Sequence, residues 1–145
     1  MKLGVICDGI SRDLSHALKV MDEFGLDYAE LQFVWDKEVG DHDASEIAQI
    51  KELLDTHNKP VSCLSRHIFA GLTTASKAGD KDHTRHMDYL KCVIEMAHQL
   101  NCPLVRIMTS KKEQILWGTN GAEHWNVAKG AWDTFCLLYT SDAAD

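Results

Sequence analysis

Short apolar segments alternate with amphipathic segments along almost the whole chain, and this alternation limits the fold more than any other feature of the sequence. The apolar segments predict strands at residues 2–7, 28–35, 61–65 and 104–108. The amphipathic segments predict helices at residues 11–24, 43–58, 80–100 and from about 121 onward. Because each strand is followed by a helix, we expect parallel strands joined by right-handed helical crossovers.

Capping residues indicate where the first two helices begin and end. Ser11 is the predicted N-cap of the first helix, whose apolar stripe runs to Phe24, and Gly25 is expected to end it. Asp43 precedes the second helix and has Glu46 three residues later, which is the spacing of a capping box.

The composition is that of a globular α/β protein and excludes several classes of function. The chain has 145 residues, 45% of them hydrophobic, and a net charge of −7. This charge argues against a nucleic-acid-binding surface, and no apolar run approaches the roughly 20 residues of a membrane span. Five scattered cysteines, without a Cys-x-x-Cys pair or an export signal, favour a reducing, cytoplasmic location. The chain has neither a Gly-x-Gly-x-x-Gly motif nor a P-loop.

Four strand–helix units are half of an eight-stranded (β/α) barrel, which typically has about 250 residues. We therefore expect an α/β fold of parallel (β/α) units that form roughly the first half of a TIM barrel. Residues 136–145 read like a translated sequencing-library adapter, so we expect a natural domain at 1–135 and a non-native tail at 136–145. A half-barrel leaves strand edges and one sheet face uncovered, so the isolated chain is expected to be marginally stable or prone to aggregate.

In a (β/α) barrel the functional residues lie at the C-terminal ends of the strands and in the loops that follow them. This rule selects polar and aromatic residues after each predicted strand: Asp8, Glu30, Gln32, Trp35, Arg66, His67, Arg106, Thr109 and Lys111.

Glu30 and Arg106 are charged residues inside apolar strands, where burial without a partner is costly. Both are expected to point toward the barrel centre from nearby strands, which makes them natural partners for each other. A structural ion pair and a ligand-binding pair explain this pattern about equally well.

His67 is predicted to follow the third strand directly, where an imidazole can bind a hydroxyl or a phosphate or transfer a proton near neutral pH. A loop histidine without a role is the equal alternative. Trp35 and Trp117 are suited to line a sugar pocket, and Lys111 is placed to meet a phosphate. Ordinary loop packing and an exposed lysine are the simpler explanations for these three.

Asp8 and the pair His83 and His86 have simple structural explanations. Asp8 is placed to cap the turn that follows the first strand. His83 and His86 are three residues apart, a spacing that allows a shared metal ion. Without a nearby carboxylate, we expect both histidines to be surface residues.

Several motifs resemble one known family in their order and spacing. Residues 25–32, with Gly25, Glu30 and Leu31, resemble the Gly-x-x-x-x-Glu-Leu second strand of the sugar phosphate isomerase/epimerase family, the xylose isomerase-like TIM barrels. Residues 61–65 fit its third strand. Residues 104–108 fit its Val-Arg fourth strand, although Asn101 stands where glycine is usual. Residues 123–132 also resemble bacterial members. The resemblance covers about residues 1–135.

The resemblance implies a divalent-metal enzyme that moves a proton between adjacent carbons of a sugar or sugar phosphate. It places the metal ligands and the acid/base pair on the fifth to eighth strands, beyond the four units predicted here. This chain would then supply a substrate-binding wall that includes Glu30, His67, Arg106 and Trp117. Its catalytic residues stay unknown, and the chain alone is expected to be inactive. Homo-oligomer formation by a full-length parent stays open.

Two other readings remain. A related abasic-site endonuclease uses the same barrel and has a metal histidine that His67 can mimic, although Arg106 and the acidic balance speak against it. A sugar- or polyol-binding relative without turnover is the other alternative. The residues that discriminate among these three functions are expected to lie outside the chain.

Overall fold

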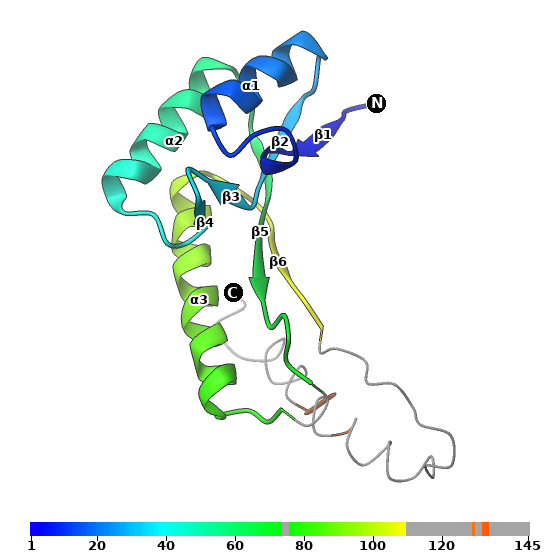
Figure 1. The fold of residues 1–145 in the computed structure, drawn as a ribbon, viewed down its shortest axis with the longest axis vertical. Coiled ribbons are helices and arrows are strands. Elements are labelled where there is room, and N and C mark those ends of the chain that lie inside the picture. Colours follow the sequence, from blue (N-terminus) through cyan, green and yellow to red (C-terminus); the bar gives the residue numbers. More distant parts are fainter. Residues whose placement is uncertain (74–75, 110–128, 130–131, 134–145) are drawn as a thin grey trace. The chain divides into compact units, whose positions relative to one another are not determined.

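A computed structural model of the chain describes residues 1–73, 76–109, 129 and 132–133 (Figure 1). The chain divides into two compact units. The first consists of Met1–Ile68 and Tyr89–Ile107, and the second of Phe69–Asp88 and Met108–Asp145. The sheet that organises the fold lies within the first unit.

The sheet has four parallel strands in the order β1-β2-β5-β6, which confirms the expected α/β class and the expected strand direction. Its strands are β1 (Gly4–Ile6), β2 (Tyr28–Leu31), β5 (Val61–Ile68) and β6 (Val105–Ile107). Sequence order and spatial order agree along the sheet, as in part of a TIM barrel.

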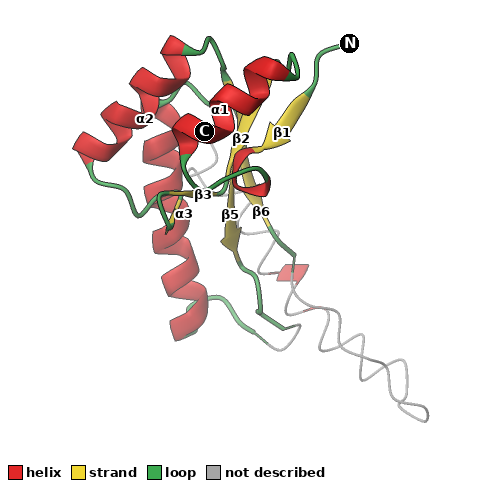
Figure 2. Ribbon diagram, turned by 45° about the horizontal axis from the view of Figure 1, so that its top comes forward, coloured by secondary structure: helices red, strands yellow, loops and turns green. Residues whose placement is uncertain are grey.

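The helices of the first unit lie on one side of this sheet (Figures 1 and 2). They are α1 (Leu14–Glu23), α2 (Ala44–Thr56) and the part of α3 (Lys81–Gln99) that begins at Tyr89; the short 3-10 helix η1 (Cys7–Gly9) follows β1. The core forms between helices and sheet, because apolar side chains from both are fully buried there: Leu18, Met21, Ala29, Leu31, Ile50, Leu64, Val93 and Met96. None of the described helices is long and apolar enough to span a membrane.

The first helix begins later than the sequence predicted. Asp13, and not Ser11, is its N-cap, and the Asp13 Oδ1 atom accepts hydrogen bonds from the backbone N–H groups of Ser15 and His16 at 3.0 and 3.4 Å. A carboxylate at this position satisfies two of the free N–H groups of the first turn. Phe24 is 76% exposed and not part of the buried stripe, because the helix has already ended and Gly25 follows with a φ of +64°.

The capping box of α2 is confirmed. The Glu46 backbone N–H donates to Asp43 Oδ1 at 2.9 Å, and the Asp43 backbone N–H donates to Glu46 Oε2 at 2.8 Å. These reciprocal bonds fix the start of the helix.

The predicted strand at 28–35 is wrong in its second half. After β2 the chain forms a small antiparallel hairpin, β3 (Phe33–Val34) and β4 (Lys37–Glu38). Trp35 and Asp36 make the turn with positive φ angles of 50° and 65°. Such turns usually carry Asn-Gly or Asp-Gly, so Trp-Asp gave no signal for a hairpin.

Strand β5 is longer than predicted and includes Arg66 and His67, which were expected to follow it. Because side chains alternate along a strand, Arg66 points to the helix side of the sheet and His67 to the opposite side. The helical stretch predicted from residue 121 falls almost entirely outside the described residues, and the tail 136–145 lies wholly outside them.

Candidate functional site

Polar side chains gather on the face of the sheet opposite the helices. We define this polar face by five residues on three adjacent strands: Glu30, Cys63, Ser65, His67 and Arg106. Two contacts support the grouping, because Glu30 pairs with Cys63 in the register of β2 and β5 and Arg106 Nη2 donates to the Ser65 carbonyl. Paired residues on neighbouring parallel strands project to the same side.

Glu30 and Arg106 interact, as the sequence predicted, and Ser65 links them. Arg106 Nη1 lies 3.9 Å from Glu30 Oε1, and Arg106 Nη2 donates to the Ser65 carbonyl at 3.0 Å. The Ser65 hydroxyl donates to the same Glu30 oxygen. The Glu30 and Arg106 side chains stay 27% and 37% exposed, so both can also contact a ligand.

His67 is held by two residues from the segment after β2. Its Nδ1 atom lies 2.7 Å from Glu38 Oε1, and its backbone N–H donates to the same oxygen at 2.9 Å. The Gln32 amide nitrogen lies over the ring, 3.0 Å from His67 Nε2 and 3.2 Å from His67 Nδ1. The ring stays 47% exposed, so His67 is an oriented surface histidine and not a free loop residue.

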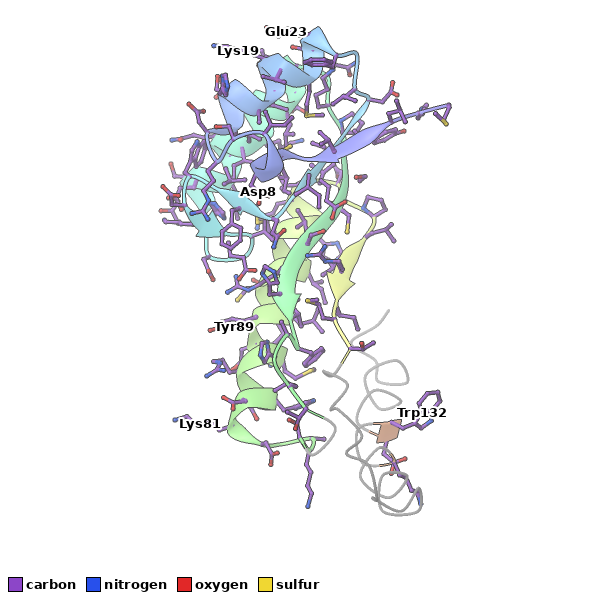
Figure 3. All side chains as sticks on the ribbon, turned by 45° about the vertical axis from the view of Figure 1, so that its right-hand side comes forward. Asp8, Lys19, Glu23, Lys81, Tyr89 and Trp132 are labelled. Atoms are coloured by element: carbon purple, nitrogen blue, oxygen red, sulfur yellow. The ribbon has the colours of Figure 1, made fainter. Side chains whose placement is uncertain are left out.

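Arg66 is structural rather than part of the polar face. Its guanidinium forms a two-pronged pair with Asp41 at 2.7 and 3.1 Å, and Nη1 also donates to the Val39 carbonyl at 2.7 Å. The guanidinium carbon lies 4.2 Å from the centre of the Tyr89 ring, which projects from α3 (Figure 3). Arg66 thus ties the segment after the hairpin to the helix side of the sheet.

Trp35 lies at the hairpin turn. Its backbone N–H donates to the Arg12 carbonyl at 2.9 Å, and its ring packs edge-on against His42 with 6.4 Å between ring centres. These contacts explain Trp35 as a turn residue. Trp117 and Lys111, the other predicted ligand contacts after the strands, fall outside the described residues.

Asp8 lies on η1, directly after β1 (Figure 3). Its Oδ1 atom accepts a long hydrogen bond of 3.4 Å from the Phe33 backbone N–H. It therefore anchors the start of β3 to the end of β1, which is a wider structural role than capping its own turn.

Cys7 is the most buried thiol of the site region, with its Sγ atom 3.8 Å from Met21 Sδ. Burial first, and then the nearby negative charges of Asp8 and Glu30, together raise the pKa of Cys7 to about 12. A thiol with this pKa is protonated at neutral pH and is not a nucleophile.

His83 and His86, in the second unit, were expected to be surface residues, and this expectation is wrong. His86 is buried, and its Nδ1 atom accepts from the Phe69 backbone N–H at 3.0 Å. His83 stacks on the Phe69 ring with 5.7 Å between ring centres. Phe69 therefore lies against both imidazoles. The described residues contain no group of three or more metal-ligating side chains.

Sequence reasoning missed Glu38 and Ser65, although both belong to the polar face or hold it. Ser65 was detectable, because Cys63, Ser65 and His67 alternate along one strand in the same way as Glu30 and Gln32 after Tyr28. Glu38 was not detectable, because its contact with His67 depends on a hairpin that the sequence did not reveal.

Comparison with known proteins fits this geometry. A family model described as "Xylose isomerase-like TIM barrel" matches residues 18–136. Among curated proteins, none shows significant similarity to the chain. The matched family is generally enzymatic, with isomerase-, epimerase- and endonuclease-like members. Since the match covers most of the sequence, the chain belongs to the xylose isomerase-like TIM barrel family.

Proposed function

We propose that this chain supplies the substrate-binding wall of a sugar or sugar-phosphate isomerase or epimerase that transfers a proton between adjacent carbons. The polar face carries the proposal. Its charged and hydrogen-bonding groups lie toward the C-terminal ends of parallel strands, where enzymes with this barrel bind their substrates.

The residue types suit a polyhydroxy ligand. The Arg106 guanidinium carries only donors and can bind a hydroxyl oxygen or a phosphate. The ionised Glu30 carboxylate carries only acceptors and can accept hydrogen bonds from sugar hydroxyl groups. Since the two groups lie only 3.9 Å apart, adjacent hydroxyls of one sugar can bridge them.

The divalent metal ion that the family implies does not fit the described residues. No three potential ligands come together there, and the Glu30 oxygen nearest Arg106 already accepts from Ser65. We therefore assign Glu30, His67 and Arg106 to substrate binding. We assign the metal ligands and the acid/base pair to the fifth to eighth strands of the barrel, where the family resemblance places them.

Nuclear magnetic resonance of the purified chain tests the binding role. D-fructose and D-fructose 6-phosphate are titrated separately while the side-chain signals of Arg106 and His67 are followed. We expect both signals to shift, and we expect Arg106→Gln to weaken the response. Lys51→Gln is the control, because Lys51 forms an exposed ion pair with Asp55 on α2, away from the polar face. No response at Arg106 or His67 to either sugar would overturn the proposal.

Two further measurements separate the alternatives. The chain alone is expected not to incorporate solvent deuterium into a bound sugar, because the acid/base pair is assigned to the fifth to eighth strands of the barrel. Turnover by the purified chain would contradict that assignment. A DNA duplex with an abasic site is expected to leave the Arg106 and His67 signals unchanged, and a response confined to this duplex would favour an endonuclease.

A further inference from the structure

The β3–β4 hairpin carries a carboxylate to the side of His67. Glu38 Oε1 lies 2.7 Å from His67 Nδ1 and also accepts the His67 backbone N–H at 2.9 Å. The Glu38 side chain is only 18% exposed. One carboxylate oxygen thus fixes both the backbone and the ring of this histidine.

This contact determines where the imidazole proton lies. An ionised carboxylate can only accept hydrogen bonds, so the Nδ1 atom that faces it must carry a hydrogen. In the neutral ring, Nε2 is then the atom without a hydrogen and can only accept. The Gln32 amide nitrogen lies 3.0 Å from Nε2 and 3.2 Å from Nδ1, so it sits over the ring and leaves the in-plane acceptor position of Nε2 open.

Arg66 holds Glu38 from the other side. Arg66 Nε lies 3.6 Å from Glu38 Oε2, while Glu38 Oε1 faces His67. The Arg66 guanidinium is itself fixed by Asp41 and the Val39 carbonyl. The carboxylate therefore has little freedom to turn away from the imidazole.

We propose that Glu38 is a positioning residue that keeps His67 in the Nδ1–H tautomer and presents Nε2 as a hydrogen-bond acceptor for a ligand hydroxyl. The role of Nε2 toward a ligand hydroxyl, the ligand half of this inference, rests on the proposed function. The tautomer that Glu38 imposes on His67, the tautomer half, does not.

Long-range ¹⁵N–¹H correlation spectra of the neutral imidazole read the tautomer directly, without substrate or turnover. We expect Nδ1–H in the wild-type chain. Glu38→Gln should retain it, because the carbonyl of glutamine still accepts, whereas Glu38→Leu should shift His67 toward Nε2–H. The matched control is Glu46→Leu, which removes a carboxylate paired with Lys37 and should leave the His67 spectrum unchanged.

Nε2–H in the wild-type chain would overturn the inference. An unchanged tautomer in a folded Glu38→Leu variant would do the same. If Glu38→Leu does not fold, loss of Nδ1–H in Glu38→Gln would still contradict the inference, and the wild-type spectrum would still decide it.

D-fructose titration then tests the ligand half. A shift of the His67 Nε2 signal together with the Arg106 signals supports a hydroxyl at Nε2. A shift at Arg106 without one at Nε2 would refute the hydroxyl role of His67. If neither signal responds while the tautomer is Nδ1–H, the proposed function fails and the positioning role of Glu38 stands.

Discussion

Two arginines on neighbouring strands differ sharply in their surroundings. Arg66 on β5 is 5% exposed at its side chain, with two short contacts to Asp41, one to a carbonyl and an aromatic ring beneath it. Arg106 on β6 is 37% exposed and forms an ion pair of 3.9 Å with Glu30. Both interrupt apolar strand sequences, so the direction of the side chain, and not the sequence pattern, separates them.

The comparison separates a structural from a binding role. On the helix side, a cation is accepted only when its donors are satisfied, because an unpaired buried charge is strongly unfavourable. On the polar face, a half-exposed cation can keep part of its surface for a ligand. The first arrangement favours stability, and the second favours recognition.

The largest effect is expected when the buried arginine loses its charge. Arg66→Met removes the donors that Asp41 and the Val39 carbonyl use, so we expect a loss of about 3 kcal/mol in the free energy of unfolding. Urea denaturation measures this loss. Arg12→Gln is the control, because its ion pair with Asp36 is exposed and should contribute less than about 1 kcal/mol. Equal losses in both variants would remove the distinction between the two kinds of arginine.

The same contrast should appear within β5 between neighbouring residues. Leu64 is fully buried on the helix side, so Leu64→Ala should cost about 3 kcal/mol through lost burial and a cavity. Cys63, on the polar face, is only partly buried, and Cys63→Ala should cost less than about 1 kcal/mol. Thermal or urea denaturation of the two variants gives the comparison. A costly Cys63→Ala would show that the polar face is packed as tightly as the core.

The pH dependence of stability gives a further comparison between buried and exposed groups, here the thiols. The folded-state pKa of Cys7 is raised from 9.0 to about 12, mainly by burial, so the folded chain favours the neutral thiol. The associated stability is fully present below pH 9.0 and is lost as the pH rises from there toward 12.

Denaturation curves measured across this pH range test the effect, with Cys7→Ala as the variant that should lose this part of the slope. Alkylation offers a second readout. Among the four cysteines that the structure describes, the exposed Cys92 should react first and the buried Cys7 last. Rapid alkylation of Cys7 in the folded chain would contradict the assigned burial.

Periodicity could predict the sheet and the helices because each element buries a regular set of apolar side chains. Leu14, Leu18 and Met21 recur on one face of a helix, and this spacing can be recognised from a short stretch of the sequence alone. The Glu30–Arg106 pair was predictable for a similar reason, since an unpaired charge in an apolar strand needs a partner.

Other parts of the site depend on geometry that no local pattern carries. The contact between Glu38 and His67 joins residues 29 positions apart. It requires the hairpin turn at Trp35 and Asp36, both with positive φ and neither a glycine. The end of β5 was placed too early because a charged Arg66 suggested a loop, whereas Asp41 and Tyr89 satisfy it within the strand.

The smallest effect on stability is expected at the second arginine. Arg106→Gln breaks an ion pair whose members are both partly exposed and 3.9 Å apart, so the free energy of unfolding should change by less than about 1 kcal/mol. The same variant should nevertheless weaken sugar-phosphate binding, because glutamine lacks the charge and the paired donors of the guanidinium. Urea denaturation and ligand titration on one sample measure both quantities. A large loss of stability would place Arg106 with Arg66 as a structural residue, whereas unchanged stability with weakened binding would separate the two arginines by function.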